Sequence, residues 1–168
     1  MIFVTVGTTL FDELVAEVDR LCTRGFLTAR VVCQIGSGAY EPKHCESFRF
    51  APSLGPWYEQ ADLVICHGGT GTVCELLALG KPFVPVANTR LAGDHQSDFL
   101  AVCAQRFGIA WCRGVGDLAE AVRRVRPVKP HGPGAHHLGD DLRLYLDRIR
   151  PHGRRTSGRA SQATRAPC

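Results

Sequence analysis

Residues 62–80 read "DLVICHGGTGTVCELLALG", an apolar run followed by a glycine-rich turn and then by a helix-like run. Glycines let a backbone approach another group without a Cβ in the way. The first N–H groups of a helix have no partner within the helix, and the helix dipole adds about half a positive charge there. The stretch therefore predicts a strand, a turn over residues 68–71 and a helix whose N-terminus suits a phosphate or a diphosphate.

The same order of strand and then helix extends from this stretch toward both ends of the chain. Alternation at this spacing is typical of a mostly parallel sheet with helices on both faces, which places the chain in the α/β class. We expect one Rossmann-like domain over residues 1–150. The predicted strands are 2–6, 31–35, 47–51, 62–66, 83–87 and 109–112, and the predicted helices are 8–22, 56–61, 72–80, 94–107, 116–125 and 138–150.

The composition fits a single globular domain, because 45% of the 168 residues are hydrophobic and 21% are charged. The net charge of +4 arises from residues 151–168, which contain four arginines and no acid and are predicted to form a disordered tail. The neutral remainder predicts no nucleic-acid partner. No apolar run reaches the roughly 20 residues of a membrane span, and the opening residues lack the pattern of a signal peptide, so we expect a cytoplasmic protein.

The eight cysteines are scattered, without a C-x-x-C pair, and several lie inside apolar runs. A thiol in such a run behaves as a small hydrophobic group. We therefore expect reduced cysteines in the core, in preference to a disulfide framework or a metal site.

Three glycine-bearing loops follow predicted strands directly, beginning at Gly7, Gly36 and His67. In open α/β sheets, ligands bind outside the carboxyl ends of the strands, where the strand order reverses. The loops "GTT", "GSG" and "HGGTGT" are therefore predicted to gather at one edge of the sheet and to form a cleft.

Further polar residues would serve a nucleotide ligand at this edge. Thr70 and Thr72 carry hydroxyl donors, and Glu75, one turn into the helix, could accept hydrogen bonds from a ribose diol. The alternative is a plain glycine-rich turn with a solvated Glu75. The motif is neither G-x-G-x-x-G nor G-x-x-x-x-G-K-[ST], so neither a dinucleotide fingerprint nor a P-loop is indicated.

A second polar cluster, "GDHQSD" at 93–98, stands at the start of the next predicted helix. Asp94, His95 and Gln96 are residue types that hydrogen-bond sugar hydroxyls. The alternative is that Asp94 caps the helix and that its neighbours are merely exposed.

The stretch "HGGTGTVCELLALGKPFVPVAN" with the following "GDHQ" resembles the nucleotide-sugar-binding half of GT-B glycosyltransferases, the C-terminal domain of glycosyltransferase family 28. The segments "MIFVTVGTT" and "QIGSGAYEP" resemble the small catalytic subunits of two-component transferases. These include the dolichol-linked UDP-GlcNAc transferase and bacterial capsule and exopolysaccharide transferases. The resemblance covers roughly residues 1–115.

The resemblance implies a role for each matching residue of this chain. His67 also matches the family pattern, and its implied role is either to contact the donor or to shape the turn. The implied donor-binding set is Gly7, Thr8 and Thr9 beside the donor phosphates, Gly68, Gly69, Thr70, Gly71 and Thr72 around the diphosphate, Glu75 at the uridine ribose, and His95 and Gln96 at the donor sugar.

The reaction implied by the resemblance inverts the anomeric carbon of a UDP-sugar and uses no metal or other cofactor. No D-x-D pair is present to hold a metal-bound diphosphate. A complete GT-B enzyme has two Rossmann-like domains, so a membrane-anchored partner subunit is expected to bind the polyprenyl- or dolichyl-diphosphate-linked acceptor and to supply the general base. His67 and His95 are the weaker candidates for a base within this chain.

The resemblance also implies a location and leaves alternatives open. The chain is expected at the cytosolic membrane face, where its partner holds it. The predicted helix 138–150 either docks to this partner or packs back on the sheet of its own chain. UDP-GlcNAc is the first expected donor, with UDP-galactose and UDP-glucuronate as alternatives. The chain could instead be a non-catalytic nucleotide-sugar-binding or regulatory subunit. A UDP-GlcNAc 2-epimerase needs both domains in one chain, for which 168 residues are too few.

Overall fold

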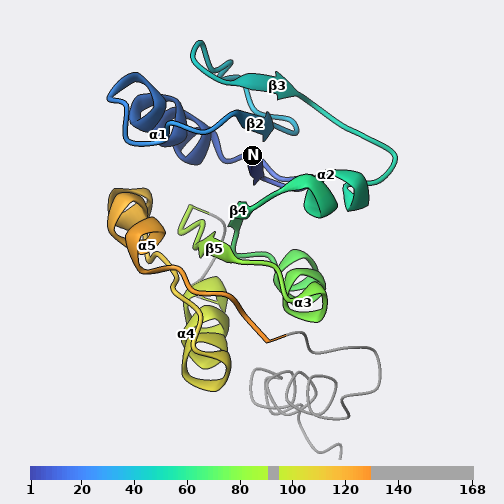
Figure 1. Cartoon of the computed structure of the whole chain (residues 1–168), viewed down its shortest axis with the longest axis vertical. Helices are drawn as coiled ribbons and strands as arrows, with labels where there is room; N and C mark the ends of the chain where they lie inside the picture. Colours follow the sequence, from blue (N-terminus) through green and yellow to red (C-terminus); the bar gives the residue numbers. More distant parts are fainter. Residues whose placement is uncertain (91–94, 130–168) are drawn as a thin grey trace, which may run out of the picture. The chain divides into compact units, whose positions relative to one another are not determined.

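The computed structural model describes residues 1–90 and 95–129, and these residues contain a parallel sheet (Figure 1). Its strand order is β3-β2-β1-β4-β5, and every neighbouring pair is parallel. The predicted α/β class with a parallel sheet is confirmed. The strands are β1 (Ile2–Thr5), β2 (Val31–Gln34), β3 (Glu46–Phe48), β4 (Leu63–His67) and β5 (Phe83–Val86).

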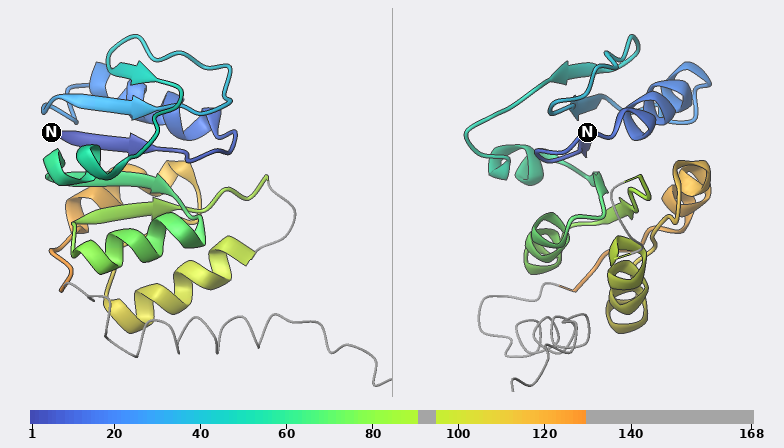
Figure 2. Two further views of the ribbon diagram at one scale, coloured as in Figure 1. Left: turned by 90° about the vertical axis from the view of Figure 1, so that its right-hand side faces the viewer. Right: turned by 180° about the vertical axis from the view of Figure 1, so that it is seen from behind.

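Helices cover both faces of this sheet, as Figures 1 and 2 show. Helices α1 and α5 lie over one face and α2 and α3 over the other, while α4 lies beyond the β5 edge. The helices are α1 (Asp12–Thr23), α2 (Gly55–Gln60), α3 (Thr70–Leu79), α4 (His95–Phe107) and α5 (Leu118–Arg124), the last preceded by the 3₁₀ turn η1 (Val115–Asp117).

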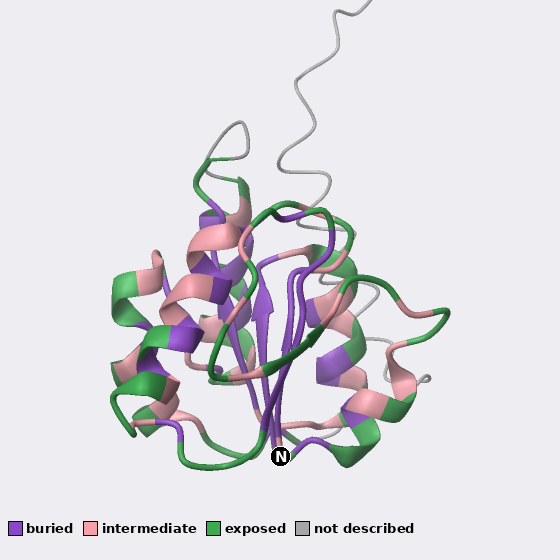
Figure 3. Cartoon of the chain, turned by 90° about the horizontal axis from the view of Figure 1, so that it is seen from above, coloured by how far each residue is buried: buried purple, intermediate pink, exposed green. Residues whose placement is uncertain are grey.

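Coverage on both faces explains why the strands are apolar almost throughout. Every residue of β1, β2, β4 and β5 is buried (Figure 3). On one face, Val4 and Ile65 pack with Leu14 of α1 and Leu118 of α5 in a single cluster. On the other face, the Phe3 ring stacks on Trp57 and meets Tyr58 edge-on, at centroid distances of 5.7 and 5.8 Å.

The prediction of a strand at 109–112 is wrong, because this segment forms no strand in the structure. Only Cys112 reaches the sheet, through a bridge with Val86. Its N–H donates to the Pro85 carbonyl and its carbonyl accepts from Ala87, both at 2.9 Å. The segment follows Gly108, which has a φ of +68°. The chain then turns into η1, so it runs along the sheet for one residue only.

Other boundaries moved by a few residues. Helix α1 begins at Asp12, four positions later than predicted, because the Thr9 hydroxyl donates to the Val6 carbonyl (2.7 Å) and holds a turn there. The predicted strand 47–51 is shorter, as β3 ends at Phe48. The predicted helix 138–150, the tail 151–168 and Asp94 lie outside the described residues, and the domain boundary at 150 stays a prediction.

Cys33, Cys66, Cys103 and Cys112 are buried, as expected for small hydrophobic groups, and no disulfide joins two of the described cysteines. Within the part of the chain that the structure describes, no helix combines the length and the apolar character needed to cross a membrane.

Candidate functional site

The sheet reverses its order between β1 and β4. From β1 the chain winds outward through β2 and β3, then returns to β4 on the other side of β1. The carboxyl ends of β1 and β4 therefore form the switch point at which α/β sheets bind ligands. His67 ends β4, and Gly7 lies two residues beyond β1.

The three predicted glycine loops do contact one another at this edge. A Cβ on Gly36 would lie 2.8 Å from the Thr9 carbonyl oxygen and 3.0 Å from that of Gly7. Gly36 and Gly7 both have a positive φ, of +56° and +65°. Only glycine adopts this backbone conformation at little cost, so both positions require it.

The His67 ring fills the space between the β1 and β4 loops. A Cβ on Gly7 would lie 2.7 Å from Cε1 of His67, and one on Gly69 would lie 2.2 Å from Nε2. The side chain is buried, and burial lowers its pKa, an effect that the Thr5 backbone carbonyl partly opposes. Although that carbonyl is near, Nδ1 has no partner of hydrogen-bonding geometry among the described residues. The ring is therefore neutral near pH 7 and shapes the turn.

The N-terminus of α3 is open. Helix α3 begins at Thr70, its N-cap residue is Gly69, and no side chain of residues 1–90 or 95–129 caps it. Thr70 and Gly71 are exposed. Since the first N–H groups of a helix have no partner within the helix, this end offers donors and the positive end of a dipole to a ligand.

The glycines of this turn differ in what their absent side chains would touch. A Cβ on Gly68 would lie 2.8 Å from Cδ1 of Leu100 on α4, so packing explains that glycine. A Cβ on Gly71 would meet nothing within 4 Å. Since glycine in a helix is less stable than alanine by about 0.5–1 kcal/mol, packing within the described residues gives no reason for a glycine at position 71.

Thr72 lies half-buried in the first turn of α3, and its contact with a donor stays a prediction. Burial raises the pKa of the Tyr58 hydroxyl on α2, the charge of Glu75 adds to the rise, and a hydrogen bond from Thr72 opposes it. The Thr72 hydroxyl therefore lies near the Tyr58 hydroxyl of α2. Glu75 is exposed one turn further along α3.

A buried asparagine that sequence reasoning missed ties the β5 end to this site. The Asn88 side chain donates from Nδ2 to the Leu10 carbonyl at 3.0 Å. Its backbone N–H donates to Oε1 of Gln96 at 2.8 Å. The carbonyl oxygen of Gln96 is therefore engaged by the backbone at the end of β5. His95, the first residue of α4, is exposed.

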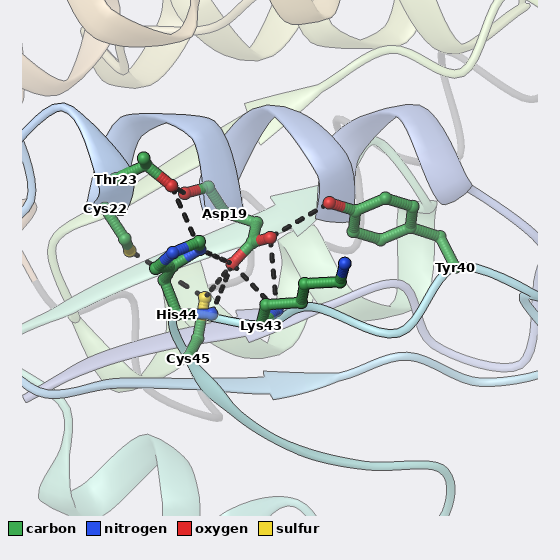
Figure 4. Close-up of polar contacts among 7 residues, drawn as sticks. All are labelled: Asp19, Cys22, Thr23, Tyr40, Lys43, His44 and Cys45. Carbon is green, nitrogen blue, oxygen red and sulfur yellow. Dashed lines mark hydrogen bonds and ion pairs between the residues drawn. The ribbon is translucent and has the colours of Figure 1, made fainter.

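The loop between β2 and β3 is fastened to α1 by a buried carboxylate, Asp19 (Figure 4). Asp19 accepts hydrogen bonds from the Tyr40 hydroxyl (2.9 Å) and from the backbone N–H groups of Lys43 (3.1 Å) and His44 (2.7 Å). Burial raises the pKa of Asp19, but these hydrogen bonds outweigh burial and hold the pKa below its usual range.

We expect Asp19→Asn to lower the free energy of unfolding by about 2 kcal/mol near neutral pH, because it removes the charge that these donors share. A carboxylate with a lowered folded-state pKa stabilises the fold above its unfolded pKa, near 4. That stabilisation is lost as pH falls through the folded pKa. Urea unfolding from pH 7 down to pH 3 measures the effect. The exposed Asp98 gives the control, Asp98→Asn, and equal losses in both variants would contradict the role of Asp19.

Comparison with known families gives a match over most of the chain. Residues 1–126 match the model of the glycosyltransferase family 28 C-terminal domain. The chain is 45% identical over 105 residues to the UDP-N-acetylglucosamine transferase subunit ALG13 of Mus musculus and 41% identical over 108 residues to that of Homo sapiens. Each alignment covers 56% of this chain and 9% of the relative, so the chain spans about a tenth of the length of these relatives.

Solved structures show the same fold. The solution structure of an ALG13 protein aligns with a TM-score of 0.55 and 21% identity, over 89% of this chain and 96% of that chain. The crystal structure of the glycosyltransferase SnogD from Streptomyces nogalater aligns with a TM-score of 0.54 and 23% identity, over 89% and 40% of the two chains.

Proposed function

The chain belongs to the glycosyltransferase family 28 C-terminal domain family, and on that premise we propose that it is the donor-binding, catalytic subunit of a UDP-sugar-dependent glycosyltransferase. The observation that carries the proposal is the open N-terminus of α3 at the β1–β4 switch point, with Gly71 in its first turn. A helix N-terminus of this kind stabilises a diphosphate, which is the leaving group of a nucleotide-sugar donor.

The proposed donor lies across the carboxyl edge of the sheet. The backbone of residues 69–72 holds the diphosphate, beside loop 7–9, while Glu75 accepts hydrogen bonds from the uridine ribose. His95 and Nε2 of Gln96 contact the donor sugar. The buried His67 supports the turn from beneath, which favours a positioning role over its alternative as a base.

The proposed reaction is an inverting displacement. An acceptor hydroxyl oxygen attacks the anomeric carbon of the donor sugar, the bond from that carbon to UDP breaks, and the hydroxyl proton passes to a base. The N-terminus of α3 stabilises the negative charge that develops on UDP. Since the sequence has no D-x-D pair, the proposed stabilisation is metal-independent.

A separate subunit completes the proposed enzyme. It is membrane-anchored, binds the lipid-diphosphate-linked acceptor and supplies the general base, so this chain would act at the cytosolic membrane face. UDP-GlcNAc is the proposed donor, because the ALG13 relatives are named as UDP-N-acetylglucosamine transferase subunits. The alternative, a non-catalytic nucleotide-sugar-binding subunit, would use the same binding residues.

Calorimetric titration of the purified chain with UDP, GDP and ADP in EDTA tests the proposal. Binding of UDP alone without metal is the expected result, and binding of none of the three would overturn donor binding by this chain. Transfer of GlcNAc to a lipid-linked acceptor, measured with the chain added to membranes that carry the acceptor-binding subunit, separates the catalytic proposal from the non-catalytic alternative.

We expect Glu75→Ala to weaken UDP binding roughly tenfold to hundredfold, because the ribose loses hydrogen bonds to a charged acceptor. Glu75 is exposed on α3, so the fold should be unaffected. Glu59→Ala removes an exposed carboxylate from α2 and is the matched control. Equal UDP affinities in the two variants would place the ribose elsewhere.

A further inference from the structure

Two buried side chains hold the backbone N–H and the backbone carbonyl of Gly7. Its N–H donates to Oγ1 of Thr5 at 3.1 Å. Its carbonyl oxygen accepts from Nε2 of Gln34 at 2.8 Å. Both the N–H and the carbonyl oxygen of Gly7 are therefore held in place. The residue has a left-handed backbone conformation, which residues other than glycine rarely adopt.

Thr5 and Gln34 are also bonded to each other. The Thr5 hydroxyl donates to Oε1 of Gln34 at 2.6 Å, and Nε2 of Gln34 donates a second hydrogen bond to the Arg49 carbonyl at 2.7 Å. The two residues are register partners at the carboxyl ends of β1 and β2. They are 0% and 2% exposed, so the bond between them is buried, while the bonds to Gly7 and Arg49 are partly buried.

Stability of the sheet alone does not explain this polar pair. Two apolar residues of similar shape at these positions would avoid the cost of burying a hydroxyl and an amide. What the pair adds is orientation, because a fully satisfied buried network fixes one arrangement of the groups that it joins.

The orientation of Gly7 governs the candidate site. Its Cα faces the His67 ring, where a Cβ would lie 2.7 Å from Cε1, and its carbonyl lies against Gly36. A shift of Gly7 would therefore move loop 7–9 and release the ring that supports Gly69 at the N-cap of α3.

We propose that Thr5 and Gln34 are positioning residues of the donor site, which set the Gly7 peptide and through it the loops that receive the diphosphate. This inference rests on the proposed function. It adds two residues, at the ends of β1 and β2, that touch no donor atom themselves.

The test replaces the Thr5 hydroxyl by a methyl group of similar shape. We expect Thr5→Val to weaken UDP binding about tenfold. Thr5→Ser, which keeps the hydroxyl, should bind within about threefold of the wild type. Val18→Ala lowers stability in the core beneath α1 without touching Gly7 and serves as the control. The inference is overturned if Thr5→Val binds UDP like the wild type, or if Val18→Ala loses as much affinity.

A second readout needs no ligand. Hydrogen exchange of the Gly7 amide, followed by NMR in the free chain, should quicken in Thr5→Val and not in Thr5→Ser. If the wild type fails to bind UDP, the proposed function fails, while this measurement still decides whether the pair fixes Gly7. Should Thr5→Val not fold, the double variant Thr5→Val/Gln34→Leu removes both partners of the buried bond together. Unchanged Gly7 exchange in that variant would overturn the inference.

Discussion

Gly71→Ala is expected to be more stable than the wild type and to have lost most of its UDP affinity. A Cβ at position 71 meets no atom of the described residues within 4 Å, so it fits among them without strain. Alanine in a helix is favoured over glycine by about 0.5–1 kcal/mol. The same methyl group would project into the space that the diphosphate needs at the N-terminus of α3. A change that improves the fold and removes binding separates a functional glycine from a structural one.

Gly71→Val extends this prediction to a larger side chain, which should abolish UDP binding while the fold stays intact. Urea unfolding and calorimetry on the same samples measure the two effects. Gly116→Ala is the control, because a Cβ at that glycine also meets nothing within 4 Å and the residue lies in η1. Gly116→Ala should bind UDP like the wild type. Retained affinity in Gly71→Val would move the diphosphate away from α3.

The part of the fold that could be predicted is the part that local patterns encode. The run from residue 62 to residue 80 became β4, the turn and α3, with Gly80 in the left-handed conformation that ends the helix. Strand periodicity and glycine positions carry this information within a few residues of chain. The contact between the β1, β2 and β4 loops was predictable as well, because parallel strands end at the same edge.

The buried polar residues around the site could not be predicted in the same way. Asn88 bonds Leu10, which is 78 positions away, and Gln34 bonds Gly7, which is 27 positions away. No local pattern reports a partner that only the folded sheet brings near. The proximity of Thr72 to Tyr58 of α2 is likewise a tertiary contact that no local pattern reports.

Gly69→Ala is expected to damage both the fold and donor binding. The new Cβ would lie 2.2 Å from Nε2 of His67, closer than any real contact permits. The ring has little room to move, because Gly7 also packs against it, at Cε1. We expect a loss of roughly 1–3 kcal/mol in the free energy of unfolding. UDP binding should disappear as well, because the N-cap of α3 must shift.

A double-mutant cycle with His67→Ala assigns the cause of this damage. Removing the ring leaves a cavity and destabilises the chain by itself, yet it also removes the group that the Gly69→Ala methyl would strike. The double variant should therefore be more stable than the sum of the single losses predicts, by roughly 0.5–3 kcal/mol. Strict additivity would mean that Gly69 is needed for some reason other than the imidazole. A favourable coupling would establish His67 as the residue that requires a glycine at position 69, so that the N-terminus of α3 depends on a histidine that need not touch the donor.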